Sequence, residues 1–409
     1  MSRIKLSHPT GILRGRIQIA GSKSESNRLL VLKELYAPGA TVVGLSNSSD
    51  TEVLLEAFKK YKQSESLNVG DAGTAIRFLT AFLAQADGTW ILEGSSRMHQ
   101  RPIGILVDAL RQMGADIEYQ NEEGYPPLRI KGQKLKGGTL YIDPSVSSQY
   151  ISALMMIAPK LSQGLELKFK GTPVSTPYIQ LTGNLMRRMG FPVFMLGEEV
   201  RIPAHQLKHI PAKLEVEPDW SSASYWFAMA ALAKKAELFL PGFKEYSLQG
   251  DSIIQKLIAP LGVEQMFIGA GIRIRKSAAF PHRPILNLVN TPDLAQTLLP
   301  AYAAKGYAME LKGLQTLKIK ETDRIEALKV ELRKFQVDLS SDDSSIKING
   351  NFKEQGATIE SYGDHRMAMG FAPLALLQPI EIKNPEVVEK SYPGFWEDCE
   401  RLGFELEWL

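Results

Sequence analysis

The sequence lacks the features that mark several protein classes. Its 409 residues contain one cysteine, Cys399, which excludes an intramolecular disulfide framework and favours a reducing, cytoplasmic compartment. No uncharged apolar run approaches the roughly 18 residues of a membrane span, so none is expected. The N-terminal segment also lacks the apolar core of a signal peptide, so no secretory leader is expected.

Neither sign of charge predominates in the sequence. The formal net charge is only +3, and no basic run or aromatic–basic motif occurs, so nucleic acid is not an expected partner. The sequence has no Cys/His spacing typical of zinc, no P-loop and no Gly-x-Ser-x-Gly pattern. With 44% hydrophobic and 23% charged residues, the composition is that of a folded protein, and the length favours two or three domains.

The sequence does contain a repeated junction. Six times a strand-like run meets a short polar turn, and a helix-like run follows. The last five junctions are spaced 76, 74, 72 and 71 residues apart, at Asp71, Ser147, Ser221, Asp293 and Asp364. A period this long indicates a whole α+β unit rather than a solenoid repeat. In the third and fourth units the pattern reads β-α-β-α-β-β, with helices ending at glycines 114 and 190.

The first unit is shorter than the others. Only 47 residues separate Ser24 from Asp71, and the segment between Lys60 and Leu67 leaves no room for the β-hairpin of the later units. We therefore expect the first unit to lack this hairpin. A change in character near residues 217–219 marks a crossing between two halves of three junctions each, and a ligand held by both halves would lie between them.

The first junction places cations at a helix start. It follows a strand expected at Arg16–Ile19, and Lys23 and Arg28 then lie near the first helical turn. Cations there oppose the helix dipole, which is unfavourable for stability alone. A bound anion is one explanation, and an N-cap by Ser22 or Ser24 with solvated charges is the other.

Four further motifs carry weaker signals when taken singly. Gly73 could simply provide a positive φ in a turn, and a lone arginine such as Arg101 is usually a surface residue. Lys320 and Arg324 would share one helical face with two carboxylates between them. That arrangement fits either a salt-bridged helix start or a phosphate site beside an acid/base carboxylate. In Gly363–Met369 capping would require only the aspartate, so the His-Arg pair that follows favours function.

Taken together, these motifs resemble the enolpyruvyl transferase family, and within it the EPSP synthases. The resemblance covers nearly the whole chain. It rests on nine segments in order: Gly21–Arg28, Asp71–Arg77, Arg101–Gly104, Ser145–Gln149, Val174–Tyr178, Pro292–Asp293, Lys320–Arg324, Asp364–Met369 and Lys390–Pro393. It implies a two-domain inside-out α/β barrel of six βαβαββ-type repeats, three per domain. One domain would be residues 1–20 with 218–409, and the other residues 21–217.

The resemblance also implies a reaction. The enolpyruvyl group of phosphoenolpyruvate is transferred to the 5-hydroxyl of shikimate 3-phosphate and phosphate is released, in the shikimate pathway to chorismate and aromatic amino acids. No metal or organic cofactor is implied. The protein is expected to be a cytoplasmic monomer with glyphosate as an inhibitor. The discontinuous domain would carry phosphoenolpyruvate-side residues and the catalytic carboxylates, and the other domain shikimate 3-phosphate-side residues.

Residue roles follow from the resemblance motif by motif. Asp293 is the expected base for the 5-hydroxyl, and Glu321 with Lys23 is expected to handle the proton at the methylene carbon of phosphoenolpyruvate. Binding of shikimate 3-phosphate is implied for Lys23, Ser24, Arg28, Ser147, Ser148, Gln149, Ser175, Tyr178, Asp293, Thr316 and Lys320. Binding of phosphoenolpyruvate is implied for Lys23, Gly73, Arg101, Gln149, Glu321, Arg324, His365, Arg366 and Lys390.

Two departures and two alternatives accompany this interpretation. Thr316 occupies the place of a frequent Asn, and Phe78 that of a frequent Pro. The sister family that transfers enolpyruvyl to UDP-N-acetylglucosamine usually uses a loop cysteine, whereas Cys399 lies near the C-terminus. The other alternative is a non-catalytic anion-binding protein built on the same repeats. Binding two anions does not require carboxylates, so Asp293 and Glu321 argue against it.

Overall fold

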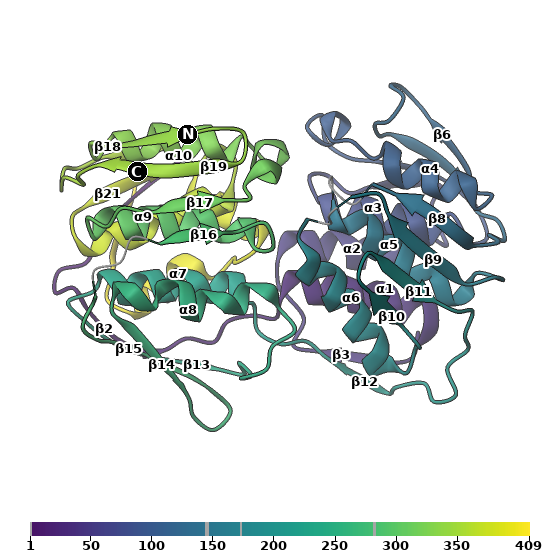
Figure 1. The fold of residues 1–409 in the computed structure, drawn as a ribbon, viewed down its shortest axis with the longest axis horizontal. Helices are drawn as coiled ribbons and strands as arrows, with labels where there is room; N and C mark the ends of the chain where they lie inside the picture. The colour runs from purple at the N-terminus through teal and green to yellow at the C-terminus, as the bar shows by residue number, and fades with distance from the viewer. Residues whose placement is uncertain (1, 144–146, 172–173, 281–283) are drawn as a thin grey trace. The chain divides into compact units, whose positions relative to one another are not determined.

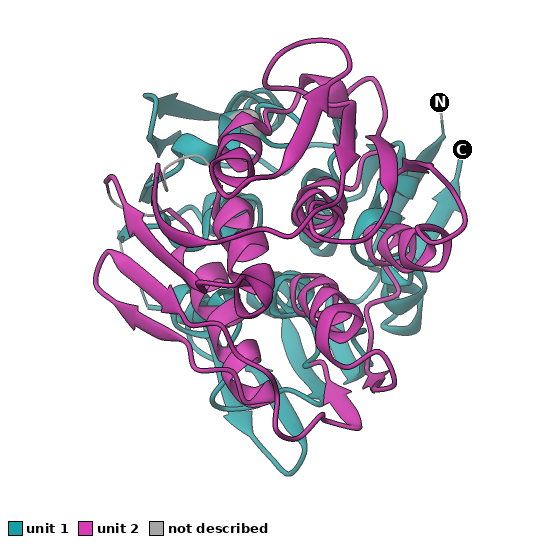
Figure 2. Cartoon of the chain, turned by 90° about the vertical axis from the view of Figure 1, so that its right-hand side faces the viewer, with its two compact units in different colours: residues 1–20, 217–409 teal, residues 21–216 magenta. Residues whose placement is uncertain are grey.

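The chain divides into two compact units (Figure 1). The computed structural model describes residues 2–143, 147–171, 174–280 and 284–409, so Ser145 and Val146 of the third junction lie outside the described residues. Unit 1 comprises Met1–Ala20 and Glu217–Leu409, and unit 2 comprises Gly21–Val216 (Figure 2). The second boundary therefore lies one residue before the expected division between residues 217 and 218.

Unit 2 contains the first three junction helices and their sheets. Its α-helices are α1 Lys23–Tyr36, α2 Ser49–Lys60, α3 Gly73–Leu83, α4 Gly104–Gln112, α5 Ser148–Ile157 and α6 Thr176–Met189. Its strands are β3 Thr41–Val43, β4 Ser66–Asn68, β5 Thr89–Glu93, β6 Asp116–Tyr119, β7 Leu128–Lys131, β8 Gly138–Ile142, β9 Leu165–Phe169, β10 Phe194–Leu196, β11 Glu199–Ile202 and β12 Lys213–Glu215.

Unit 1 contains the last three junction helices. Its α-helices are α7 Trp220–Leu232, α8 Ile254–Ile258, α9 Ala295–Ala304, α10 Arg324–Arg333, α11 His365–Phe371 and α12 Phe395–Arg401. Its strands are β1 Arg3–Ser7, β2 Ile12–Arg16, β13 Lys235–Pro241, β14 Val263–Phe267, β15 Gly271–Lys276, β16 Ile285–Asn287, β17 Glu310–Lys312, β18 Val337–Ser341, β19 Ser345–Gly350, β20 Thr358–Ile359, β21 Ile380–Lys383 and β22 Glu405–Trp408.

Each complete repeat forms a four-stranded sheet of one design. Two parallel strands lie side by side, and an antiparallel pair extends the sheet from the second of them. Unit 2 has two such sheets, with orders β4-β5-β7-β6 and β10-β11-β9-β8. Unit 1 has three, with orders β14-β15-β13-β2, β16-β17-β19-β18 and β20-β21-β1-β22. The predicted β-α-β-α-β-β order is confirmed.

The first repeat lacks the hairpin, as the sequence predicts. Helix α2 ends at Lys60, turn residues follow, and β4 begins at Ser66. Strand β3 is left in a two-stranded parallel sheet with β12. The C-terminal end of α2 is charged, since Glu56 pairs with Lys59 at 3.5 Å and with Lys60 at 3.1 Å, all exposed to solvent.

Two strands pair with a strand of a different repeat from the one that follows them in the chain. Strand β2 precedes α1 in the chain but pairs in parallel with β13, whereas β12 precedes α7 but pairs in parallel with β3. The strand expected at Arg16–Ile19 is in fact β2, which ends at Arg16. Alternate burial continues through Ile17 and Ile19, but the ladder ends where Ile17 N–H donates to the Phe239 carbonyl at 3.0 Å.

The junction helices form the centre of the units and the sheets face outward. All residues of α11 are buried, and so are those of α9 from Ala295 to Ala303. A helix that is buried on every side belongs in a core. The predicted two-domain inside-out α/β barrel of six repeats, three per domain, is confirmed. Among the described residues, no helix combines the length and apolarity needed to cross a membrane.

Candidate active site

In unit 1 the starts of three junction helices meet. Asp364 caps α11 by accepting a hydrogen bond from the backbone N–H of Arg366 at 2.8 Å. The Arg366 side chain donates to Ser221 Oγ in α7 at 3.4 Å and lies 3.2 Å from Asp293 Oδ2 in the 3-10 helix η5, Pro292–Leu294, which leads into α9. The repeat thus brings polar turns that are about 70 residues apart in sequence into one cluster.

Asp293 is surrounded by three cations. Its Oδ1 lies 2.6 Å from Arg324 and 3.5 Å from Lys320 Nζ, and its Oδ2 lies 3.2 Å from Arg366. Burial alone would raise the pKa of Asp293, but Arg366, Lys320 and Arg324 outweigh it and hold the pKa well below its usual range. The half-buried carboxyl is therefore ionised.

Arg324 is surrounded by carboxylates in turn. It is 1% exposed, and its Nε lies 2.6 Å from Asp364 while one terminal nitrogen lies 2.8 Å from Glu321. Burial lowers the pKa of Arg324, but Asp364, Glu321 and Asp293 raise it above its ordinary value. The guanidinium is thus fixed in place by charged hydrogen bonds to three carboxylates, which are stronger than neutral ones.

Lys320 reaches this cluster from outside the helix. Helix α10 begins only at Arg324, after the N-cap Asp323, whose side chain accepts from two backbone N–H groups. Lys320 follows the 3-10 helix η6, Gln315–Ile319. The predicted shared helical face of Lys320 and Arg324 is therefore wrong. Both cations instead converge on Asp293.

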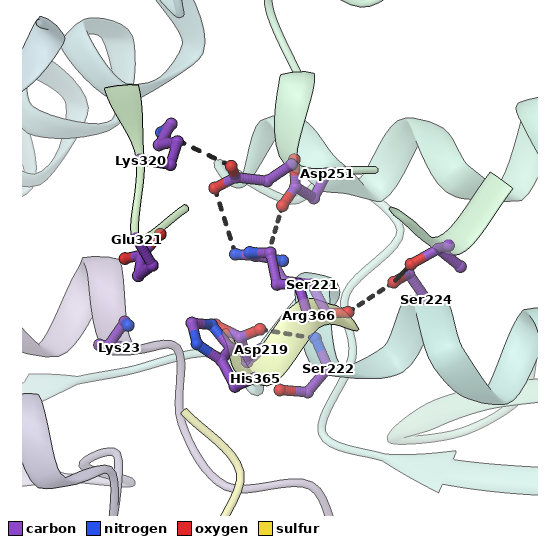
Figure 3. A network of polar contacts seen from close by, with 12 residues as sticks. Lys23, Asp219, Ser221, Ser222, Ser224, Asp251, Lys320, Glu321, His365 and Arg366 are labelled. Atoms are coloured by element: carbon purple, nitrogen blue, oxygen red, sulfur yellow. Dashed lines mark hydrogen bonds and ion pairs between the residues drawn. The ribbon is translucent and has the colours of Figure 1, made fainter. Parts of the chain in front are cut away.

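Further polar side chains lie behind Arg366 (Figure 3). Ser221 Oγ donates to Asp251, and Tyr225 OH accepts from Arg366 at 3.5 Å. Burial raises the pKa of Asp251 to about 6, against the opposing effect of Arg366. Sequence reasoning missed Ser221, Tyr225 and Asp251 as site residues. Asp251, in the 3-10 helix η3, is a single acidic residue after a glycine, so only its position in the fold distinguishes it.

A second cluster of candidate residues lies in unit 2. The sequence offered Ser22 or Ser24 as the N-cap of α1. The structure shows that Ser22 caps the helix, because its hydroxyl accepts a hydrogen bond from the backbone N–H of Glu25. Lys23 Nζ, on the first turn, lies 3.2 Å from Asp50. The start of α5 is tied to α3, because Gln149 Nε2 donates to Thr74 Oγ1 at 3.0 Å.

Arg28 is buried, and the hydrogen bonds described for it go to neutral groups. It is 2% exposed, and it donates to Thr182 Oγ1 at 2.7 Å, Ser152 Oγ at 3.0 Å and the Ser24 carbonyl at 2.8 Å. Its guanidinium carbon lies 5.4 Å from the centre of the Phe78 ring, so the departure from proline at this position supplies a cation–π contact. Burial lowers the pKa of Arg28 to about 10, so the side chain remains charged at neutral pH.

Gly73 and Arg101 form one structural feature. Gly73 is the first residue of α3, and its φ is not positive, so the expectation of a left-handed turn is wrong. A Cβ at this position would lie 2.6 Å from a terminal nitrogen of Arg101. Glycine at this position lets the Arg101 guanidinium pack directly against its Cα.

The other predicted residues take these positions. Ser175 occupies the N-cap position of α6 in a left-handed conformation with φ 53°, and Tyr178 lies one turn further. Thr316 is buried in η6, and Lys390 ends the 3-10 helix η8, Pro385–Lys390, which packs against α11. Unit 1 holds Asp293, Thr316, Lys320, Glu321, Arg324, His365, Arg366 and Lys390. Unit 2 holds Lys23, Ser24, Arg28, Gly73, Arg101, Ser147, Ser148, Gln149, Ser175 and Tyr178.

Unit 1 combines groups that could exchange a proton with groups that could hold an anion. Two carboxylates, Asp293 and Glu321, lie among three cations, and His365 is 3.9 Å from Asp364. Within the described ranges, no group of three or more His, Cys, Asp or Glu side chains is placed to hold a metal ion.

Comparison with known proteins places this geometry in a family. Residues 59–399 match the model of the EPSP synthase (3-phosphoshikimate 1-carboxyvinyltransferase) family. The chain is 44% identical to the 3-phosphoshikimate 1-carboxyvinyltransferase of Bacteroides fragilis over 409 residues, which is 99% of both chains. It is 36% identical to the protein of that name from Aliivibrio salmonicida, covering 96% of this chain and 98% of the relative.

A solved structure shows the same fold. The EPSP synthase of Acinetobacter baumannii superimposes with a TM-score of 0.80 over 100% of both chains, at 23% sequence identity. The family match extends across most of the sequence, and the curated relatives match nearly end to end. This chain therefore belongs to the EPSP synthase family.

Proposed function

We propose that this chain transfers the enolpyruvyl group of phosphoenolpyruvate to the 5-hydroxyl of shikimate 3-phosphate and releases phosphate. The observation that carries the proposal is Asp293, an ionised, half-buried carboxylate that contacts Lys320, Arg324 and Arg366. Cations alone would suffice to bind anions, whereas moving a proton requires a base. The carboxylate inside the cation cluster therefore favours catalysis over the non-catalytic alternative.

The reaction proceeds by addition and elimination. Asp293 accepts the proton of the 5-hydroxyl as that oxygen bonds to C2 of phosphoenolpyruvate, and Glu321 with Lys23 delivers a proton to the methylene carbon. The tetrahedral intermediate then loses that methyl proton and phosphate, which restores the double bond. Incoming phosphate and carboxylate groups compete with Asp293 for its cations, so substrate binding raises the basicity of this carboxylate.

The two clusters supply different parts of this chemistry. In unit 1 we assign Glu321, Arg324, His365, Arg366 and Lys390 to phosphoenolpyruvate, and Asp293, Thr316 and Lys320 to shikimate 3-phosphate. Unit 2 supplies Ser24, Arg28, Ser147, Ser148, Ser175 and Tyr178 for shikimate 3-phosphate, Gly73 and Arg101 for phosphoenolpyruvate, and Lys23 and Gln149 for both. Glyphosate is proposed to compete with phosphoenolpyruvate, and the enzyme to act as a cytoplasmic monomer without a cofactor.

One assay tests the proposal. Phosphate release is measured with both substrates together and with each alone. We expect release only when both are present, because phosphate leaves after the carbon–oxygen bond has formed. Release from phosphoenolpyruvate alone would indicate a phosphatase, and no release with both substrates would overturn the proposed activity.

A further inference from the structure

The turn before α11 has an unusual backbone conformation. Tyr362 and Gly363 are both left-handed, with φ of 56° and 66°. A bulky residue rarely adopts this conformation, and it persists only where the surroundings fix it. The next residue, Asp364, caps α11 and binds Arg324 Nε at 2.6 Å. The turn therefore sets the direction in which the start of α11 enters the cluster.

A fully buried carboxylate holds this turn. Glu331, 0% exposed, lies in α10 two turns beyond Arg324. It accepts hydrogen bonds from the Tyr362 hydroxyl at 2.8 Å and from the backbone N–H of Glu360 at 3.1 Å. Lys334 Nζ, 2.6 Å away, pairs with its charge. Burying a carboxylate costs free energy unless it is paired and hydrogen-bonded. The hydrogen bonds from the turn and the ion pair with Lys334 meet this requirement for Glu331.

Helix α10 is thus joined to the turn at two points. Arg324 binds Asp364 at one end, and Glu331 binds Tyr362 toward the other. Burial, reinforced by Glu331, raises the pKa of Tyr362 above its ordinary range, so its hydroxyl remains a donor. None of the hydrogen bonds and ion pairs that the structure describes for Glu331 and Tyr362 involves Asp293 or Arg366, so they act through the turn.

We propose that Glu331 and Tyr362 are positioning residues for Arg366, and that their hydrogen bond fixes the left-handed turn from which Arg366 approaches the phosphoenolpyruvate anion. This inference rests on the proposed function for the identity of the anion. It predicts a selective effect. Loss of the hydrogen bond weakens the affinity for phosphoenolpyruvate and leaves that for shikimate 3-phosphate unchanged.

Tyr362→Phe is the primary test, because it removes only the hydroxyl. We expect the KM for phosphoenolpyruvate to rise about tenfold. This is the loss of affinity expected if the free energy of one charge-assisted hydrogen bond is fully transmitted to the contact between Arg366 and the anion. The KM for shikimate 3-phosphate and kcat should change less than about twofold on this argument. Glu331→Gln should act in the same direction, and the double variant should resemble the single ones because both remove one interaction.

Tyr61→Phe is the matched control. Tyr61 donates to Glu34 at 2.9 Å, the same kind of hydrogen bond, but in unit 2. Both variants should lose comparable thermal stability, and only Tyr362→Phe should change the KM. Equal KM values for phosphoenolpyruvate in wild type, Tyr362→Phe and Glu331→Gln would overturn the inference, as would effects that add fully in the double variant.

A second measurement separates this inference from the proposed function. Inorganic phosphate is titrated against thermal unfolding, which requires no turnover. The wild type should be stabilised, and Tyr362→Phe should need about tenfold more phosphate for the same shift. If the wild type lacks turnover but this difference is found, the proposed activity fails and the positioning role stands. Identical phosphate dependence in both proteins would overturn the positioning role.

Discussion

Two buried arginines show how the two units differ. Arg324 in unit 1 and Arg28 in unit 2 are 1% and 2% exposed. Arg324 binds three carboxylates, whereas Arg28 binds two hydroxyls and a carbonyl. Burial lowers the pKa of each. The carboxylates more than reverse this effect for Arg324, whereas the pKa of Arg28 falls to about 10.

The difference indicates two kinds of site. A cation that is already paired with carboxylates holds those carboxylates in place, which suits proton transfer. A buried cation with neutral partners gains most from an incoming anion, which suits binding. We therefore expect substitutions in the unit 1 cluster to reduce turnover or stability, and substitutions in the unit 2 cluster to reduce affinity.

The largest effect is expected for Asp293→Asn. This change keeps the shape of the side chain but removes the proposed base, so turnover should fall by about 10²–10⁴. Binding of shikimate 3-phosphate, measured by calorimetry, should persist because the cations remain. Asp338→Asn removes a carboxylate of an exposed pair with Arg333 and should leave turnover unchanged. Near-normal turnover in Asp293→Asn would place the base elsewhere.

Replacing the two arginines by methionine tests the comparison itself. Arg324→Met removes the ion-pair partner of the buried Asp364 and one partner each of the half-buried Asp293 and Glu321, and it should lower the free energy of unfolding by about 3–5 kcal/mol. Arg28→Met leaves neutral groups and should cost about 1–3 kcal/mol. Urea denaturation measures both, and calorimetry should show loss of shikimate 3-phosphate binding in Arg28→Met. A larger stability loss for Arg28→Met would contradict the distinction.

Asp251 provides a prediction about pH. Its folded pKa of about 6 exceeds the ordinary 3.8, so the folded state binds the extra proton and stability falls as pH rises through this window. Asp251→Asn removes the titration. The free energy of unfolding of Asp251→Asn, relative to that of the wild type, should therefore rise by about 2.4 kcal/mol between pH 4 and pH 7. Denaturation at both pH values tests this, and a constant difference would show that Asp251 titrates normally.

The smallest effect is expected for Gly73→Ala. The added methyl would lie 2.6 Å from the Arg101 guanidinium, which can move, so the fold should survive. The KM for phosphoenolpyruvate should rise about tenfold if Arg101 loses one charged contact. Glyphosate is slightly longer, so its inhibition constant should rise more, through a clash with one ligand only.

Gly39→Ala is the control for this substitution. Gly39 also lies in unit 2, but no atom lies within 4 Å of an added Cβ. Its kinetics and inhibition should match the wild type. Equal inhibition constants for wild type and Gly73→Ala would show that Gly73 does not line the pocket.

Local signals account for what the sequence predicted well. Two helices were predicted to end at Gly114 and Gly190. Both glycines have a positive φ, of 100° and 103°, which is the left-handed conformation in which glycine often ends an α-helix. The missing hairpin follows from the spacing of Lys60 and Leu67. The pairing of β2 with β13 depends on contacts between distant segments, which no periodicity reveals.

The candidate site shows the same limit. Asp293 and Arg324 stand in recognisable motifs, but the sequence misplaced Lys320 on a helix and assigned Gly73 a positive φ. Only packing reveals that Arg101 occupies the space beside Gly73. Likewise, Glu331 is an ordinary helix residue in sequence, and its role depends on the turn it contacts.

The pairing of β1 has a consequence for synthesis on the ribosome. Strand β1 pairs only with β21 and β22 among the described strands, with Ile4 opposite Trp408. Unit 2 is contiguous, so it can complete its sheets while most of unit 1 is still untranslated. Strand β2 can pair once β13 has been translated, but β1 must wait for β21 and β22. A circular permutant beginning at Glu217, with Leu409 linked to Ser2, would instead make both units contiguous and let each fold as it emerges.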